Sequence, residues 1–152
     1  MEKLGEFTRK RALGIVFFAS LIVFLLILGR WLLAYRNESA MLSTTEGRQM
    51  FLSSLGWEVD AASEEVKSLT LPEKMDGVLE EYNRLQLTQG YDLKPWLGKD
   101  CVQYTYLLTN YDAGGEEVYI CIYVHGHRVI AGDIHTNSLT GFMQGIRKPM
   151  GM

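Results

Sequence analysis

The longest apolar run of the chain lies close to its N-terminus. Residues 12–29 carry no charged side chain, and with Arg30 tolerated the apolar character continues to Tyr35. A helix over residues 12–35 would span about 36 Å, and a bilayer core needs about 30 Å. Trp31 and Tyr35 stand where interfacial aromatic residues are common. The pattern predicts an uncleaved transmembrane signal anchor over residues 12–35.

Two amphipathic helical patterns follow the apolar run. The first begins at Ser43 to Glu46, which resembles a capping box, and can end at Gly56. The second ends near Gly90 and carries a stripe at helical spacing: Met75, Val78, Leu79, Tyr82, Leu85 and Gln86. Extended segments are predicted at 57–59 and 66–71, and a loop at 91–99.

The last third of the chain alternates between apolar and polar positions, which is typical of strands. Strands are predicted at 101–110, 116–124 and 127–135. Turns are predicted at 112–115 and at His125-Gly126, and a final short helix at 138–146. The predicted fold class is α+β: an N-terminal transmembrane helix, then a small domain of two helices packed on an antiparallel meander sheet of three or more strands.

The two turns also predict a strand register. The first turn pairs Tyr104 with Ile122, and the turn centred on His125 and Gly126 pairs Ile122 with Val129. One sheet face then collects most of the apolar side chains: Tyr104, Tyr106, Leu108, Val118, Ile120, Ile122 and Val129. We expect both amphipathic helices to cover this face.

Charge is divided unevenly along the chain, whose formal net charge is −3. Residues 1–36 sum to +4 and residues 37–152 to −7. The basic flank before the apolar run predicts a cytoplasmic N-terminus and an extracellular domain at the cell membrane. An acidic domain repels phosphate backbones, so no nucleic-acid partner is expected. The predicted order is cytoplasmic tail, transmembrane anchor, linker, extracytoplasmic domain and C-terminal tail, at 1–11, 12–35, 36–43, 44–147 and 148–152.

Four segments of the chain resemble a known family. They are FLSSLGWEVD (51–60), LPEKMDGVLEEYNRLQLTQGYDL (71–93), YTYLLTNY (104–111) and RVIAGDIHTNSLTGFMQGI (128–146). In this order they resemble a family of uncharacterised, membrane-anchored proteins of Gram-positive, mostly clostridial bacteria that carries domain of unknown function 4830. The resemblance covers about residues 45–147 and implies an envelope location and a shared small fold. It implies no activity or catalytic residue, and Ala131 stands where the family usually has Gly.

A His/Asp/His set in the last predicted strand is a possible zinc site. Its members, His127, Asp133 and His135, share strand parity. Six residues of strand place His127 about 20 Å from Asp133, too far for one ion. Asp133 and His135 would need a third ligand from 138–146, so no metal site is predicted. The predicted register places Asp133 near the end of the apolar face. We expect it to be a structural polar group there that accepts backbone N–H groups or caps a helix at Ser138.

The two cysteines are predicted to be separate thiols. The predicted register puts Cys121 opposite Thr105, about 13 Å along the sheet from Cys101. A disulfide needs Cα atoms within about 7 Å. The chain contains no G-x-S-x-G motif, and Ser138 is close to His135 only in sequence. We therefore predict no catalytic residue and no cofactor.

Three residues are placed on the sheet face opposite the predicted core: Tyr119, Tyr123 and Arg128. If no helix covers that face, it forms an amphipathic patch suited to a protein or cell-wall glycan partner, and simple surface decoration is the alternative. The leading hypothesis is a non-enzymatic, membrane-anchored binding or interaction domain at the bacterial cell envelope. The alternatives are a metal- or thiol-dependent envelope enzyme using Cys121, Asp133 and His135, and a structural accessory subunit of a membrane complex.

Overall fold

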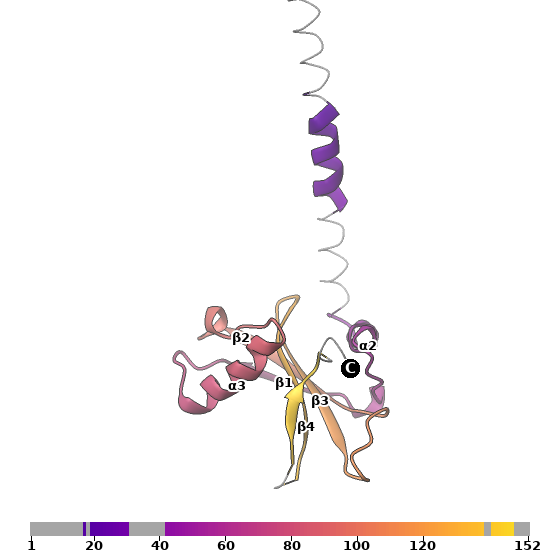
Figure 1. Cartoon of the computed structure of the whole chain (residues 1–152), viewed down its shortest axis with the longest axis vertical. Coiled ribbons are helices and arrows are strands. Elements are labelled where there is room, and N and C mark those ends of the chain that lie inside the picture. Colours follow the sequence, from indigo (N-terminus) through magenta and orange to yellow (C-terminus); the bar gives the residue numbers. More distant parts are fainter. Residues whose placement is uncertain (1–16, 18, 31–41, 139–140, 148–152) are drawn as a thin grey trace, which may run out of the picture. The chain divides into compact units, whose positions relative to one another are not determined.

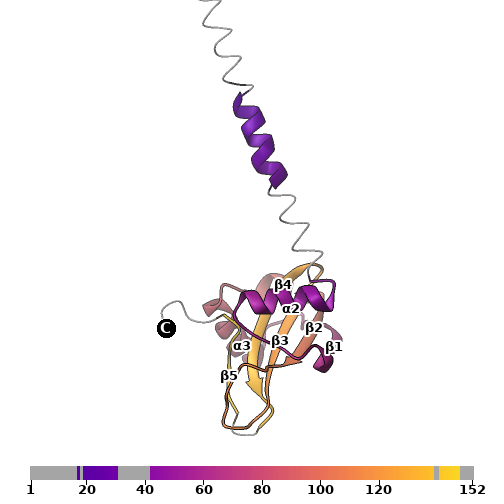
Figure 2. The ribbon, with the colours of Figure 1, turned by 90° about the vertical axis from the view of Figure 1, so that its right-hand side faces the viewer.

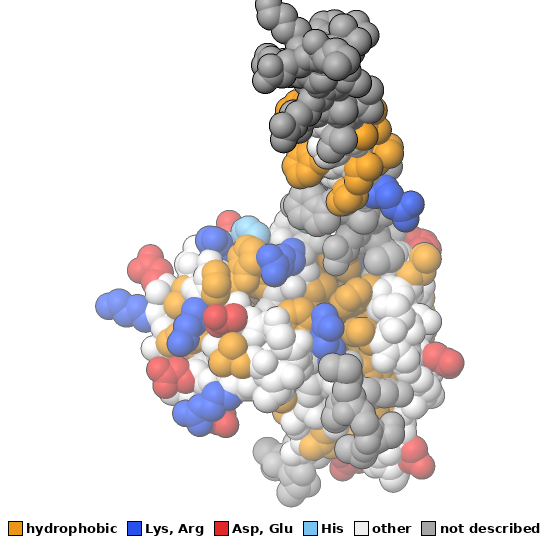
Figure 3. Space-filling model, turned by 45° about the horizontal axis from the view of Figure 1, so that its top comes forward, with side chains coloured by type: hydrophobic (Ala, Val, Ile, Leu, Met, Phe, Trp, Pro, Cys, Tyr) orange, Lys and Arg blue, Asp and Glu red, His pale blue; other side chains and the backbone are white. Residues whose placement is uncertain are grey.

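The computed structural model describes residues 17, 19–30, 42–138 and 141–147. The chain divides into two units, residues 1–37 and 38–152. In the first unit, residues 19–30 are helical, and Figure 3 shows apolar side chains along this helix. No helix within the described residues is long and apolar enough to cross a membrane. The rest of the predicted anchor lies outside these residues, as do the predicted tails and most of the linker.

The second unit begins with helix α2 (Thr45–Ser54). The Thr44 hydroxyl caps this helix by accepting the N–H of Gly47 at 3.1 Å, so the cap lies one residue after the predicted one. Gly56 follows with φ of 87°, a conformation that favours glycine, and confirms the predicted helix end. The 3-10 helix η1 (Ala61–Ser63) and strand β1 (Glu65–Thr70) come next.

Helix α3 (Gly77–Thr88) follows the first strand. The Asp76 side chain caps it by accepting the N–H of Leu79 at 2.8 Å. The 3-10 helix η2 (Lys94–Trp96) lies within the predicted loop. The remaining strands are β2 (Asp100–Leu107), β3 (Val118–His125), β4 (Arg128–Thr136) and β5 (Met143–Gly145). All five strands form one antiparallel sheet in the order β1-β2-β3-β4-β5.

The two helices cover opposite faces of this sheet (Figures 1 and 2). Leu52 of α2 is buried with Tyr106, Ile120 and Ile134 in the larger core. Leu79 and Tyr82 of α3 pack on a smaller core on the other face, which includes Leu93, Cys101, Ile130 and Ala131. The α+β class is confirmed, but the expectation that both helices cover one face was wrong.

A bulge in β4 also makes the strand register differ from the predicted one. The predicted pairing of β2 with β3 is confirmed, with Tyr104 opposite Ile122. Between β3 and β4, however, Val124 faces Val129 while Tyr123 faces Ala131, so Ile130 is an extra residue. Ile122 therefore faces Gly132 instead of the predicted Val129.

The bulge reverses which side of β4 faces the larger core. Ile134 pairs with Ile120 and is fully buried there. Asp133 pairs with Cys121, and His135 pairs with Tyr119, so both lie on the face that α3 covers. The sequence-based placement of Asp133 on the main apolar face was therefore wrong.

The C-terminal segment also differs from the prediction. The structure has strand β5 where a helix over 138–146 was expected, with Met143 opposite His135 and Gly145 opposite Asp133. Two glycines, Gly141 and Gly145, weaken a helix in this segment, while the strand supplies hydrogen-bond partners to β4. A helix cap from Asp133 to Ser138 is therefore excluded. Ser138 is exposed, and its hydroxyl donates to Glu116 at 3.4 Å.

Candidate functional site

Two glutamine side chains hold α3 against strand β4. Oε1 of Gln86 accepts the N–H of Gly132 at 2.9 Å, and Nε2 of Gln89 donates to the carbonyl of Gly132 at 3.0 Å. Gly132 lies just beyond the short pairing of β4 with β5, so the two amides complete the hydrogen bonds of the strand. Both glutamines are buried. These contacts fix the position of α3 over the sheet.

A pocket of about 400 Å³ lies between α3 and the sheet, and we name it the inner pocket. Its apolar lining comes from Pro72, Val78, Leu79, Tyr82, Tyr123 and Met143. Gln103, Asp133 and His135 bring polar groups to the same cavity, together with Cys121 and Asp76. An apolar pocket with a few converging polar groups is typical of ligand-binding sites.

Asp133 is the most deeply buried polar group of this pocket, at 3% exposure. The Tyr82 hydroxyl donates to Oδ1 of Asp133 at 2.6 Å, and Nδ1 of His135 lies 2.7 Å from Oδ2. The hydrogen bond to Asp133 raises the pKa of His135, although partial burial opposes the charged ring. Burial and the nearby Asp133 charge raise the pKa of Tyr82 well above its usual value, so its hydroxyl remains a donor.

Cys121 lies beside Asp133 on the neighbouring strand. Nε2 of Gln103 donates to its sulfur at 3.2 Å. Burial, together with the charge of Asp133, raises the pKa of the Cys121 thiol to about 12. A thiol with this pKa is protonated at neutral pH and is a poor nucleophile. Cys101 is also a free, buried thiol, so the prediction of two separate thiols is confirmed.

A second cavity of about 360 Å³, the outer pocket, extends over the same sheet face toward β1. It is lined by Glu65, Val66, Lys67, Gln103, Thr105, Tyr119, His135 and Asn137. Gln103 and His135 line both cavities. The inner and outer pockets together are therefore one candidate site, the α3-face groove.

The three residues of the predicted interaction face lie in different surroundings. Tyr119 lines the outer pocket, with its ring centroid 6.2 Å from that of His135. Tyr123 packs against Tyr82 of α3, with a centroid distance of 6.1 Å. Arg128 is exposed, and its guanidinium lies 5.7 Å from the Trp96 ring centroid. The structure brings Tyr119 and Tyr123 to the groove, but not Arg128.

The possible zinc residues are also only partly brought together. Asp133 and His135 are in contact, whereas His127 lies in the turn between β3 and β4. Among the residues that the structure describes, no three His, Cys, Asp or Glu side chains are grouped to hold a metal ion.

Sequence reasoning missed Gln103 and Lys67 as groove residues. Lys67 of β1 faces Gln103 of β2, and Gln103 faces Tyr123 of β3. Opposite residues of antiparallel strands share a face, so the predicted pairing of β2 with β3 contained the signal for Gln103. Lys67 could not be placed because no turn fixes the register of β1.

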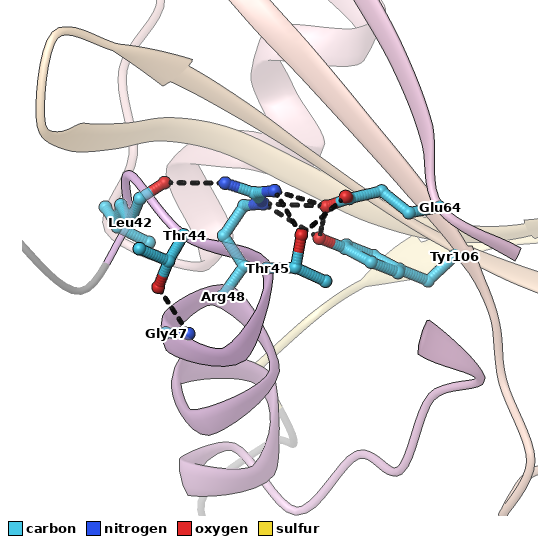
Figure 4. Close-up of polar contacts among 7 residues, drawn as sticks. All are labelled: Leu42, Thr44, Thr45, Gly47, Arg48, Glu64 and Tyr106. Atoms are coloured by element: carbon cyan, nitrogen blue, oxygen red, sulfur yellow. Dashed lines mark hydrogen bonds and ion pairs between the residues drawn. The ribbon is translucent and has the colours of Figure 1, made fainter. Parts of the chain in front are cut away.

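A buried arginine network on the α2 side was also missed (Figure 4). Nε of Arg48 donates to Glu64 at 2.9 Å and to the Tyr106 hydroxyl at 2.8 Å, and Nη1 donates to the carbonyl of Leu42 at 3.0 Å. Burial opposes ionisation of Glu64, but hydrogen bonds from Tyr106, Arg48 and Thr45 outweigh it and lower the pKa of Glu64. The network joins the start of the second unit to the sheet, so we assign it a structural role.

Comparison with protein-family models, curated proteins and solved structures finds no match to this chain. The likeness to the family of domain of unknown function 4830 therefore stays a prediction, and the site is interpreted from its own residues.

Proposed function

We propose that this chain is a membrane-anchored, extracytoplasmic, non-enzymatic binding domain, and that the α3-face groove is its binding site. The main support for this proposal is the inner pocket, whose apolar lining surrounds the buried, hydrogen-bonded Asp133 and its partner His135. Polar groups that are held in place by the fold can orient a ligand, while the apolar lining supplies affinity.

The membrane anchor in this proposal rests on the sequence. Residues 12–29 carry no charge, and basic residues outnumber acidic ones before them. The apolar side chains of helical residues 19–30 are consistent with an anchor, because most of them are exposed. The negative charge of the second unit argues against a nucleic-acid partner.

A thiol-dependent enzyme is the second candidate, because one face of the sheet gathers Cys121, Asp133 and His135. The raised pKa of Cys121 argues against it, since a nucleophilic cysteine needs a thiolate. Iodoacetamide at pH 7 should therefore modify Cys121 more slowly than a free cysteine in solution. Rapid, selective alkylation of Cys121 would favour the enzyme.

The binding proposal can be tested in membranes. The tagged full chain is solubilised from its membrane with detergent, and co-purifying proteins, peptides and glycans are quantified by mass spectrometry. The Tyr119→Ala/Val78→Asp variant changes both pockets and should lose specific molecules that the wild type retains. The Met50→Gln/Lys74→Gln variant changes exposed residues outside the groove and should retain them. Identical recovery from both variants would overturn the proposal.

A further inference from the structure

We infer that the α3-face groove binds a short peptide, with a carboxylate in the outer pocket and an adjoining apolar side chain in the inner pocket. This inference rests on the proposed binding function and adds the chemical class of the ligand. It follows from the contrast between two cavities that meet at Gln103 and His135.

The outer pocket is rich in hydrogen-bond donors. Six of its side chains carry donor groups, although the Tyr119 hydroxyl already donates to Glu117: Lys67, Gln103, Thr105, Tyr119, His135 and Asn137. Glu65 is the single carboxylate of its lining, although residues 37–152 have a net charge of −7. A carboxylate accepts short, charge-assisted hydrogen bonds from such donors. The outer pocket therefore complements a negatively charged, acceptor-rich group.

His135 connects the two halves of the groove. Its Nδ1 is held by Asp133, which leaves Nε2 as the ring nitrogen for a ligand. Nε2 donates to a carboxylate when the ring is protonated, and the hydrogen bond to Asp133 favours this state because it raises the pKa of His135. The side chain keeps 24% of its surface exposed. A ligand group in the outer pocket can therefore contact the same imidazole as a group in the inner pocket.

The size of the groove suits a few peptide residues. Neighbouring strands lie about 4.8 Å apart, so the sheet from β1 to β4 spans about 14 Å, the length of about four extended residues. The inner pocket offers Val78, Leu79 and Met143 to an apolar side chain.

Calorimetric titration of the full chain in detergent micelles tests the inference. The probes are the tripeptide acetyl-Gly-Ala-Leu as the free acid, the same peptide as the C-terminal amide, acetyl-Gly-Ala-Asn as the acid, and the tetramer of N-acetylglucosamine. We expect the Leu acid to bind about tenfold more tightly than the amide or the Asn acid, since each of these lacks one complementary group.

Two exposed residues separate the contributions of the pockets. Lys67→Gln should weaken binding of the Leu acid about tenfold and leave the amide unchanged. Val78 lines the inner pocket, so Val78→Asp makes this apolar lining charged and should reduce the preference for Leu over Asn. Because Val78 is 82% exposed, the change leaves the core intact. Lys74→Gln, an exposed change outside the groove, is the matched control and should bind like the wild type.

Each failure has a distinct meaning. Equal affinity for acid and amide, or an unchanged Lys67→Gln variant, overturns the carboxylate inference. Binding of the saccharide without the peptides assigns the groove to glycans instead. If no probe binds but membrane capture still depends on Tyr119 and Val78, the peptide inference fails while the proposed binding function stands. If no probe binds and membrane capture does not depend on Tyr119 and Val78, both the peptide inference and the proposed binding function are overturned.

Discussion

Asp133 holds His135 by one ring nitrogen, and this contact stabilises the protonated imidazole in the folded chain. Because folding raises the pKa of His135, its contribution to stability is complete below the ordinary pKa and is lost as pH rises through the folded-state value. The free energy of unfolding should therefore fall as the pH rises above about 6.5. Chemical denaturation at several pH values measures this slope.

Two variants assign that slope to the contact. His135→Gln removes the titrating ring, and Asp133→Asn removes the charged partner, so both should flatten the pH dependence in this range. A slope that persists unchanged in both variants would assign the pH dependence to other groups.

Arg48 is a buried charged residue that stabilises the fold through its hydrogen bonds. It is 4% exposed and donates to Glu64, Tyr106 and the carbonyl of Leu42. Arg48→Met keeps the apolar stem but leaves these acceptors without their donor, so we expect a loss of about 3 kcal/mol in the free energy of unfolding.

An exposed arginine of α3 provides the control for this prediction. Arg84 pairs with Glu81 at 2.5 Å, and both side chains are about 70% exposed. Arg84→Met should change stability by at most about 0.5 kcal/mol, since surface ion pairs contribute little. Equal losses in the two variants would contradict a structural role for the buried network.

At the scale of elements, α3 depends on its glutamine contacts with β4. Gln86→Met conserves side-chain volume but removes the acceptor of the Gly132 N–H. We expect a loss of about 1–3 kcal/mol, because a buried donor is left unsatisfied. Native-state hydrogen exchange should show faster exchange at Gly132 than in the wild type, while the N–H of Leu108, bonded to Val118 across the sheet, should lose protection only to the extent of global destabilisation.

Periodicity predicted the elements better than their partners. Both helices, the β2–β3 register and the ends at Gly56 and Gly90 followed from local patterns, which depend on residues close in sequence. The positions of α2 and α3 on opposite faces did not follow, because both helices have an apolar stripe and nothing in either stripe specifies a sheet face.

Only part of the candidate site could be predicted from the sequence, because strand alternation is reliable only up to the bulge in β4. Tyr119 and Tyr123 were placed on the correct strand face, since β3 keeps regular alternation. Asp133 and His135 were placed incorrectly, because one extra residue at Ile130 changes the face of everything after it in β4. A bulge has no reliable signature in a single sequence.

At the scale of the whole molecule, the burial of both native cysteines permits a direct test of orientation. Cys101 and Cys121 are 4% and 1% exposed, so a membrane-impermeant maleimide should not label the folded parent chain. Ser53→Cys introduces an exposed thiol on α2, and we expect labelling in intact cells because the domain is proposed to lie outside the membrane.

The opposite side of the membrane gives the control. Thr8→Cys lies in the predicted cytoplasmic tail and should be labelled only after the membrane is opened. The reverse pattern would contradict the orientation, and recovery of the chain without membranes after cell breakage would contradict the anchor.

The extra residue in β4 makes the domain sensitive to the length of this strand. Deleting Ile130 would turn Ile134 out of the larger core and bring Asp133 into it, without altering any other side chain. A single insertion or deletion between the hairpin turn and Asp133 should therefore disrupt the domain even where every remaining side chain is conserved. In any related chain, the number of residues between this turn and the pair Asp133 and His135 should be compared first, before the residue types in that segment.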